Sequence, residues 1–314
     1  MARTSSSPVV ASGAAADAAP GRSLALHLLF SLRPAQWSKN LVVFAGLLFG
    51  RRLLDRDAVL AAVGAFVVFC ALSGVVYLVN DLTDRESDRR HPLKARRPIA
   101  SGALPASTAV AAAVALAAAG LAGAAAIGRP FTMAAIAYLV LQLAYSAALK
   151  HVVIIDVLTI AAGFVLRAAA GAVAVNVEIS HWLFVCTILL ALFIALAKRR
   201  HEIVLLASSA PSHRPILGEY SAYLLDQMIA VVTASTLMAY VFYTISPETV
   251  GKFQTRWLGL TIPFPLYGIF RYLYLVHQRD GGGSPADLLL ADRPLLACVA
   301  LWALAVALII YRPL

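Results

Sequence analysis

The sequence has little charge for its length. Asp, Glu, Lys and Arg make up 13% of its 314 residues, whereas about 25% is usual in soluble domains. Hydrophobic residues make up 61%, and so few charged side chains cannot cover so much apolar surface in water. The composition excludes a soluble globular domain, and disordered or fibrous chains need the opposite composition. We therefore expect a membrane protein.

Cysteine is also scarce. The three cysteines, Cys70, Cys186 and Cys298, each lie in an apolar stretch without a second cysteine or histidine at the spacing of metal ligands. This spacing supports neither a disulfide framework nor a zinc site. It indicates three buried thiols.

Apolar stretches near membrane-spanning length recur along most of the chain, and a spanning helix needs about 20 apolar residues. We count nine such stretches, at residues 34–50, 58–80, 107–127, 131–149, 152–175, 182–198, 222–245, 257–276 and 294–311. They predict an all-α, polytopic membrane protein with about nine transmembrane helices. Residues 1–21 have no apolar run, so we expect a disordered tail before a single transmembrane catalytic domain at residues 22–314.

The charged residues are unevenly distributed between the two sides of the predicted membrane. With the N-terminus in the cytoplasm, 18 of the 26 Lys and Arg residues and 12 of the 16 acids fall on or near the cytoplasmic side. Basic loops usually remain in the cytoplasm, so we expect the N-terminus and a polar reaction chamber there. The net charge of +10 favours anionic headgroups or substrates as partners, and we expect no nucleic acid.

The segment most informative about chemistry is Asn80-Asp81-Leu82-Thr83-Asp84-Arg85-Glu86-Ser87-Asp88, which follows an apolar run directly. On a helix four of its oxygen-bearing side chains share one face: Asn80, Asp81, Asp84 and Asp88. Like charges at this spacing repel one another unless a cation neutralises them. Oxygen ligands suit Mg²⁺, which completes its shell with waters and substrate phosphates. The alternative is a solvated helix end whose acids pair with Arg85, Arg89 and Arg90.

A basic loop follows the acidic segment. It contains Arg96 and Arg97 between Pro92 and Pro98, and it closes at Gly102. Arginine binds phosphate oxygens through two parallel hydrogen bonds, and a loop restricted by proline presents arginines at little ordering cost. By itself the loop is an ordinary signal of membrane orientation. Beside an acidic metal site it favours a diphosphate-binding site.

These two motifs resemble those of the UbiA superfamily of intramembrane prenyltransferases. The acidic segment reads as its N-D-x-x-D-x-x-x-D motif, and the run from Arg96 to Gly102 contains a stretch similar to the R-P-I-x-S-G that follows. The likeness covers about residues 30–312. It implies nine helices around a central cavity, a diphosphate bound through Mg²⁺ at the cytoplasmic end, and a long lipid in a groove between helices. The implied metal ligands are Asn80, Asp81, Asp84 and Asp88, with Asp81 and Asp84 catalytic.

Within the superfamily the chain looks most like the enzymes that transfer phosphoribose to a decaprenyl-type phosphate, through residues 32–40, 145–151, 167–168 and 198–202. Members that alkylate aromatic rings have a second acidic motif, D-x-x-x-D, after the sixth helix. This chain has Lys198, Arg199 and Glu202 there. Cations in place of acids remove ligands for a second metal and add partners for phosphate. The exchange favours a donor and an acceptor that both carry phosphate.

The resemblance implies transfer from 5-phosphoribosyl 1-diphosphate to a polyprenyl phosphate at a bacterial inner membrane, with release of diphosphate, for the synthesis of a cell-envelope arabinose donor. A lipid phosphate is largely ionised near neutral pH, so no catalytic His or Cys is required. The candidates for holding substrate phosphates are Lys39, Arg96, Arg97, Lys150, Lys198 and Arg199, with Glu202 beside the last two.

The sequence leaves two roles open for each of two residues, and it leaves two other functions open for the protein. Arg167 lies well inside the stretch 152–175, where a charge is costly unless it faces a cavity or a partner, so it is either catalytic or structural. Tyr145 is either a substrate contact or an interfacial aromatic. The alternative functions are an aromatic prenyltransferase acting on 4-hydroxybenzoate or a similar acceptor, and a lipid-phosphate transporter. A transporter should place its ionisable groups nearer the middle of the membrane.

Overall fold

In the computed structural model the chain forms a bundle of long helices with short 3-10 segments between them. The structure describes residues 23–90, 94–178, 181–206, 215–278, 288–289 and 291–311. Within these ranges the regular structure is helical, with no strand. The predicted all-α class is therefore confirmed. The predicted tail at residues 1–21 lies outside the described residues.

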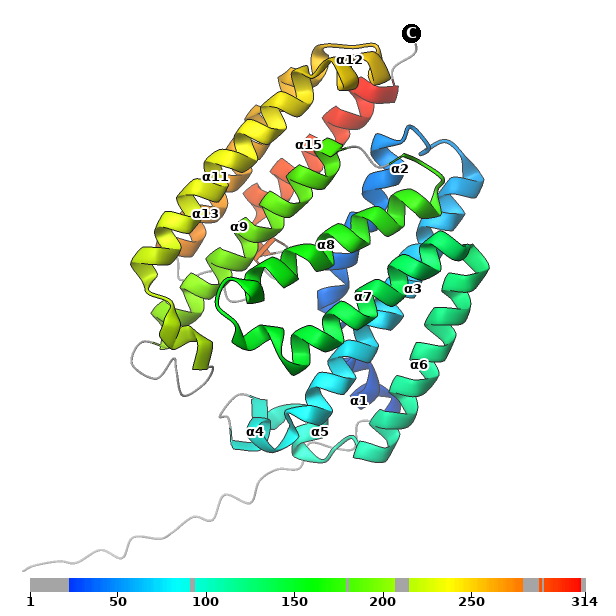
Figure 1. The fold of residues 1–314 in the computed structure, drawn as a ribbon, viewed down its shortest axis with the longest axis vertical. Helices are drawn as coiled ribbons and strands as arrows, with labels where there is room; N and C mark the ends of the chain where they lie inside the picture. Colours follow the sequence, from blue (N-terminus) through cyan, green and yellow to red (C-terminus); the bar gives the residue numbers. More distant parts are fainter. Residues whose placement is uncertain are drawn as a thin grey trace, which may run out of the picture.

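The long helices run between two ends of the molecule (Figure 1). They are α3 (Arg56–Thr83), α6 (Ala106–Ile127), α7 (Arg129–Ala147), α8 (Ile155–Ala174), α9 (His181–Leu206), α11 (Ala222–Ile245), α13 (Pro263–Gln278) and α15 (Arg293–Tyr311). The short α-helices are α1 (Leu24–Ser31), α2 (Ala45–Phe49), α4 (Arg85–Arg90), α5 (Pro98–Ser101) and α12 (Pro247–Phe253). The 3-10 segments are η1 (Pro34–Phe44), η2 (Lys94–Arg96), η3 (Leu149–His151), η5 (Pro215–Glu219) and η6 (Trp257–Thr261).

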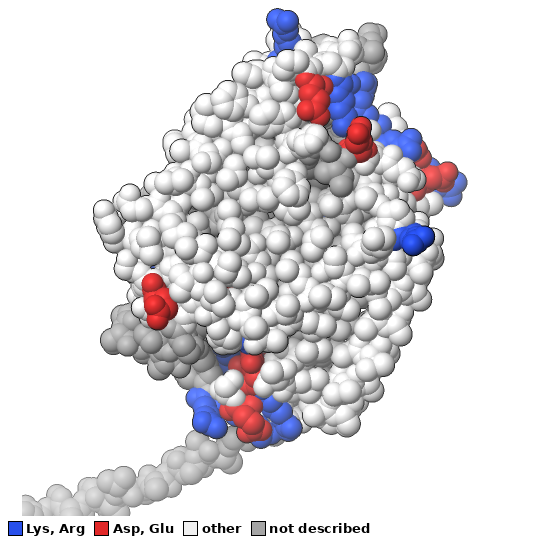
Figure 2. All heavy atoms as spheres, viewed as in Figure 1, with Lys and Arg blue, Asp and Glu red and all other residues white. Residues whose placement is uncertain are grey.

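Six of the described helices are long and apolar enough to cross a membrane, namely α3, α6, α7, α8, α11 and α15. On the face shown in Figure 2, Lys, Arg, Asp and Glu gather mainly toward the two ends of the long axis, and the belt between them is largely uncharged. The chain is thus a multi-pass membrane protein. Of the other predicted spans, α9 has 26 residues and carries a charged run near its C-terminus, and α13 has 16 residues.

The first predicted span, residues 34–50, is not a regular α-helix. Its residues form the 3-10 segment η1 and then the five-residue α2. Both pack against α8 at very short range. A Cβ on Gly171 would overlap the carbonyl oxygen of Val43, and a Cβ on Gly46 would lie 2.6 Å from the Cα of Ala172. The absence of a side chain on the two glycines permits this approach, and the segment follows the surface of α8.

The last helix closes the bundle against the first segment. The hydroxyl of Tyr311, at the end of α15, accepts a hydrogen bond from the backbone N–H of Leu53 at 2.8 Å and donates one to the carbonyl of Leu47 at 3.2 Å. Phe49 and Trp302 pack nearby with their ring centroids 6.2 Å apart. Residues almost at opposite ends of the sequence therefore form one apolar cluster.

The contact between Gly171 and Val43 makes a stability prediction. Gly171→Ala should lower the thermal unfolding midpoint in detergent, because overpacking of a tight contact costs about 1–3 kcal/mol. The matched control is Gly64→Ala in α3, where the added Cβ meets only the Cδ1 of Ile127 at 3.8 Å. Equal midpoints for the two variants would show that η1 does not depend on this contact.

Candidate active site

The acidic motif lies where α3 ends and α4 begins, beside α1 and α5 in the lower part of Figure 1. Helix α3 ends at Thr83 with Asp84 as its cap residue, and α4 begins at Arg85. Asp81 and Asp88 are buried. A buried carboxylate needs a charged or hydrogen-bonding partner, and each of these acids has one.

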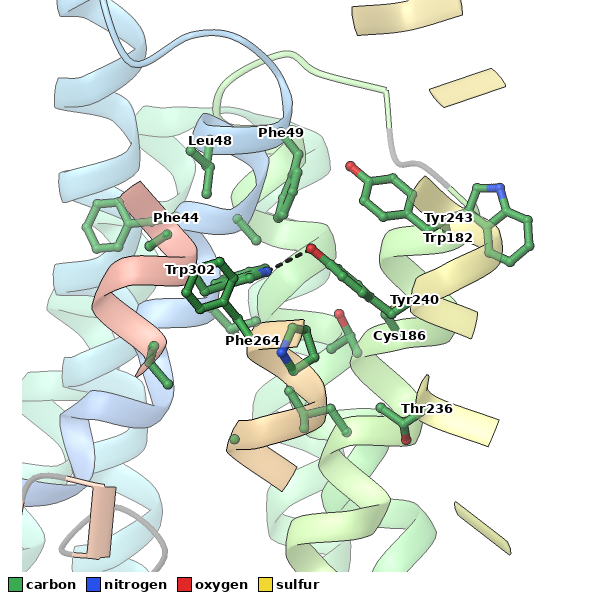
Figure 3. Close-up of a pocket in the computed structure, with 18 of the residues that line it drawn as sticks. Phe44, Leu48, Phe49, Trp182, Cys186, Thr236, Tyr240, Tyr243, Phe264 and Trp302 are labelled. Atoms are coloured by element: carbon green, nitrogen blue, oxygen red, sulfur yellow. Dashed lines mark hydrogen bonds between the residues drawn. The ribbon is translucent and has the colours of Figure 1, made fainter. Parts of the chain in front are cut away.

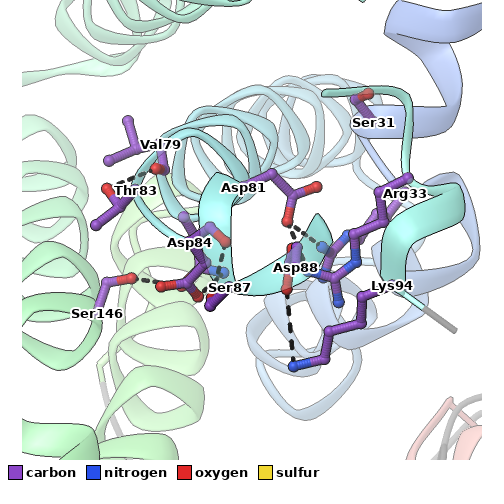
Figure 4. A network of polar contacts seen from close by, with 12 residues as sticks. Ser31, Arg33, Val79, Asp81, Thr83, Asp84, Ser87, Asp88, Lys94 and Ser146 are labelled. Carbon is purple, nitrogen blue, oxygen red and sulfur yellow. Dashed lines mark hydrogen bonds and ion pairs between the residues drawn. The ribbon is translucent and has the colours of Figure 1, made fainter. Parts of the chain in front are cut away.

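Asp81 and Asp88 share a single arginine. Nη1 of Arg97 donates to Oδ1 of Asp81 at 3.0 Å and to Oδ2 of Asp88 at 2.6 Å. Nη2 of Arg33 donates to the same Oδ1 of Asp81 at 2.6 Å, and Nζ of Lys94 lies 3.9 Å from Asp88. Figure 4 shows Arg33 and Lys94 gathered around the two carboxylates. This half of the motif has an excess of positive charge.

Asn80 and Asp84 turn the other way, toward α7. Nδ2 of Asn80 donates to Oδ2 of Asp84 at 3.1 Å, and the hydroxyl of Ser146 donates to Oδ1 of Asn80 at 2.7 Å. Nζ of Lys150 lies 3.6 Å from Asp84. Figure 4 shows Ser146 and Asp84 on one side of the helix end, away from Arg33.

The expectation that all four side chains share one face is therefore wrong for this arrangement. The helix is interrupted after Thr83, and the carboxylates form two groups: Asp81 and Asp88 share Arg97, whereas Asp84 faces Lys150. Over the described ranges no three His, Cys, Asp or Glu side chains are grouped so that they could hold a metal ion. The partners also differ from the alternative pairing with Arg85, Arg89 and Arg90, because Arg89 pairs with Glu86.

Sequence reasoning missed Arg33 as a site residue. Its backbone is left-handed, with φ of 53°, a conformation that is strained for a residue other than glycine. Its guanidinium also lies 4.7 Å from the centre of the Tyr77 ring. Like Arg97, it directly precedes a proline that begins a helix. Arg-Pro pairs also occur at residues 129, 214, 293 and 312, so the sequence carries no specific signal that would have identified Arg33.

A second polar cluster, centred on Arg199, connects α7, α8 and α9. The side chains of Arg199 and Asp156 are 1% and 0% exposed, and Nε of Arg199 donates to Asp156 at 2.8 Å. Its other nitrogens donate to Glu202 at 2.7 Å and to the hydroxyl of Tyr145 at 3.2 Å. The hydroxyl of Tyr220 donates to the second oxygen of Asp156 at 2.8 Å. A direct contact between Arg199 and a substrate phosphate would require breaking these bonds.

Arg167 belongs to a separate buried network inside the membrane. Its nitrogens donate to Oδ1 of Asn40 and to the hydroxyl of Tyr138, both at 2.7 Å, and to the carbonyl of Gly163 at 3.0 Å. Its guanidinium also lies 4.5 Å from the centre of the Tyr138 ring. Among the described residues no acid forms an ion pair with Arg167, since Asp156 is engaged elsewhere. These contacts favour its structural interpretation, and a catalytic role stays a prediction.

The structure brings most of the predicted residues into two adjacent groups. One group is Asn80, Asp81, Asp84, Asp88, Arg97 and Lys150, and the other is Tyr145, Lys198, Arg199 and Glu202. Three predicted residues lie outside both groups. Arg167 belongs to the buried network described above, and the other two lie on 3-10 segments, where Lys39 is half-buried in η1 and Arg96 is exposed in η2.

An apolar cavity of about 830 Å³ lies between α9, α11, α13 and α15 on one side and η1 with α2 on the other. Trp182, Tyr240, Tyr243 and Trp302 project toward it (Figure 3). Nε1 of Trp302 donates to the hydroxyl of Tyr240 at 2.8 Å, which satisfies two polar groups in the wall. This agrees with the expected cavity between helices, and the presence of a lipid in it stays a prediction.

Comparison with known proteins decides the family. Residues 40–290 match the UbiA prenyltransferase family. The chain belongs to this family. Decaprenyl-phosphate phosphoribosyltransferase of Corynebacterium glutamicum is 33% identical to this UbiA chain, over 93% of the chain and 89% of the relative. The enzyme of the same name from Mycolicibacterium smegmatis is also 33% identical, over 94% of the chain and 95% of the relative.

The fold is shared with a UbiA homolog from Archaeoglobus fulgidus that was solved with GPP and Mg²⁺. The TM-score is 0.70 at 20% sequence identity, over 92% of this chain and 100% of the homolog. The resemblance inferred from the acidic and basic motifs is thus confirmed. So are the UbiA-like architecture and the expectation that this UbiA chain is an enzyme of the transferase class.

The buried pair of Asp156 and Arg199 generates a prediction about stability. Asp156→Asn leaves Arg199 buried with half of its countercharge, and breaking a buried pair costs about 3–5 kcal/mol, so the unfolding midpoint in detergent should fall strongly. The control is Asp226→Asn, which removes the partly exposed partner of Arg200 and should cost about 1 kcal/mol or less. Similar midpoints for both variants would contradict the role assigned to Asp156.

Proposed function

We propose that this UbiA family member transfers the phosphoribosyl group of 5-phosphoribosyl 1-diphosphate to a polyprenyl phosphate. The observation that carries the proposal is the excess of cations around the acidic motif. Its three aspartates lie within 4.0 Å of four basic side chains, those of Arg33, Lys94, Arg97 and Lys150. A second basic cluster at Lys198 and Arg199 stands where aromatic prenyltransferases have acids. The names of the relatives support the same transferred group and a polyprenyl phosphate acceptor.

We propose Asn80, Asp81, Asp84 and Asp88 as the residues that hold Mg²⁺. Carboxylate and amide oxygens are the ligands that this ion takes from proteins, so the donor set suits the ion by chemical type. The four side chains now point in two directions, so holding one ion together requires them to turn from their present cations toward a common point. When bound there, Mg²⁺ supplies charge neutralisation for the departing diphosphate. The basic side chains that pair with these carboxylates balance their negative charge before the ion binds.

The basic side chains act on the substrate phosphates. The Arg33 and Arg97 guanidiniums each pair with carboxylates here through one nitrogen, and a guanidinium can bind phosphate oxygens through two parallel hydrogen bonds. They can therefore exchange one oxygen partner for another as the donor enters. Lys94 and Lys150 add positive charge around the same position, where negative charge grows during bond breaking.

The reaction requires one bond to form and one to break. An oxygen of the lipid phosphate attacks the anomeric carbon, and the bond from that carbon to diphosphate breaks with its electron pair on diphosphate. The lipid phosphate has a second pKa of about 6, so it is ionised without a general base. We place this chemistry on the cytoplasmic side of a bacterial inner membrane, in keeping with the basic residues at that end and the positive-inside rule, and its product would serve as a precursor for the cell envelope.

The metal-binding proposal predicts a loss of turnover in Asp84→Asn. The variant should lose at least about 100-fold in kcat, because one charged ligand is replaced by a neutral one, and excess chelator should silence the wild type. Asp57→Asn, at the opposite end of α3, is the matched control and should keep full activity. Wild-type turnover in Asp84→Asn, or in the presence of chelator, contradicts the proposal.

A substrate comparison tests the reaction itself. Purified protein should consume labelled 5-phosphoribosyl 1-diphosphate only when polyprenyl phosphate is added, and diphosphate should appear in equal amount. A parallel reaction contains polyprenyl diphosphate and 4-hydroxybenzoate, and it should give no product. Alkylation of 4-hydroxybenzoate without use of the phosphoribosyl donor would establish the alternative function.

A further inference from the structure

The apolar cavity and the basic run of α9 lie on one helix. Thr187, Leu190 and Ile194 of α9 line the cavity, and Lys198 follows Ile194 by one turn. Each residue of an α-helix turns by about 100° around the helix axis. Viewed down α9, Lys198 therefore lies roughly 20° from Thr187 and roughly 40° from Ile194, on the same side of the helix. At 1.5 Å per residue, Lys198 begins about 6 Å beyond Ile194 along the helix. A cation thus stands just past the rim of an apolar cavity.

Lys198 can leave its present partner at little electrostatic cost. Its Nζ lies 3.7 Å from Glu202, and its side chain is 38% exposed. Glu202 also accepts a hydrogen bond of 2.7 Å from Arg199, which is fixed by Asp156. If Lys198 turns to another anion, Glu202 remains paired with Arg199. Arg199 has no such freedom, because it is buried.

The two polar clusters meet at the end of α7. Tyr145 and Ser146 are consecutive residues, and the hydroxyl of Tyr145 accepts a hydrogen bond from Arg199 at 3.2 Å, whereas the hydroxyl of Ser146 donates to Asn80 at 2.7 Å. Lys198 is the neighbour of Arg199 on α9, so we expect a phosphate held by Lys198 to lie at the same end of the bundle as the acidic motif. This is the arrangement that an attack by one phosphate on a donor held at the other cluster requires.

We propose that Lys198 anchors the phosphate of the polyprenyl acceptor and that the cavity between α9, α11, α13 and α15 holds its isoprenoid chain. The assignment rests on the proposed function and adds to it which cation serves which substrate. Lys198 binds the acceptor, and the arginines around the acidic motif bind the donor. An ammonium suits this task, because it is a compact charge that can follow a phosphate monoester through three donors.

Lipid binding tests the anchor without turnover. Tritiated polyprenyl phosphate and a polyprenol of equal length are bound to immobilised protein in detergent. The wild type should bind the phosphate at least about tenfold more tightly than the alcohol, the value of one charged hydrogen bond, and Lys198→Gln should remove most of that preference. Arg200→Gln is the matched control, because it also removes one positive charge from α9, but from a side chain that pairs with Asp226. This variant should keep the preference for phosphate. Loss in both variants, or in neither, overturns the assignment.

A second variant tests the cavity. Gly268 lines it, and a Cβ there meets no atom closer than 3.8 Å, so Gly268→Leu should fold and fill part of the space. It should weaken the binding of polyprenyl phosphate and of polyprenol by similar factors, several-fold or more. The ratio of the two affinities, which is the preference for phosphate, should remain. Unchanged binding of both lipids would show that the chain lies elsewhere.

Steady-state kinetics separates this proposal from the proposed function. Lys198→Gln should raise the KM for polyprenyl phosphate and leave the KM for 5-phosphoribosyl 1-diphosphate within about twofold. If the wild type shows no phosphoribosyl transfer but Lys198 still sets the preference for phosphate, the proposed function fails and the anchor stands. If transfer occurs and Lys198→Gln raises only the donor's KM, the anchor fails and the function stands.

Discussion

The ion pair between Asp156 and Arg199 is the interaction on which the arrangement of the polar groups depends. A charge withdrawn from water must find a partner, and the effective cost per unpaired ion is several kcal/mol. Here one carboxylate and one guanidinium meet with almost no exposure, and Tyr145, Glu202 and Tyr220 take their remaining hydrogen bonds. The pair fixes the rotation of α8 and α9 about their axes. That rotation in turn decides which side of α9 faces the cavity and which way Lys198 leaves the helix.

The need to pair charges that are withdrawn from water also explains which residues surround the acidic motif at the end of α3. Three aspartates within eight residues are unfavourable together, and the fold balances them with basic side chains drawn from three other segments, at Arg33, residues 94–97 and Lys150. This balance gives a polar site that is stable before any substrate is present. Under the proposed function, the same cations would bind the substrate phosphates when they leave these carboxylates.

Local features of this chain could be predicted from its sequence, and long-range pairings could not. The apolar stretches and the run from Asn80 to Asp88 are contiguous, so most of the long helices, the membrane class and the family could be predicted from adjacent residues. The pairing of Arg33 with Asp81 joins residues 48 positions apart, and that of Arg199 with Asp156 joins residues 43 apart. Nothing in the sequence indicates that residues so far apart along the chain form an ion pair. Residues 34–50 have the composition of a span, but their shape is set by contact with Gly171, which hydrophobicity does not encode.

The walls of the apolar cavity come from distant parts of the chain. Leu41 to Leu53 supply one side, and Trp302 and its neighbours in α15 supply part of the other. Tyr311 then binds the backbone at Leu47 and Leu53. During synthesis at the ribosome, the first segment enters the bilayer long before α15 is made, and until then one side of the cavity is open to membrane lipid. This apolar cavity is therefore completed only after α15 has been made.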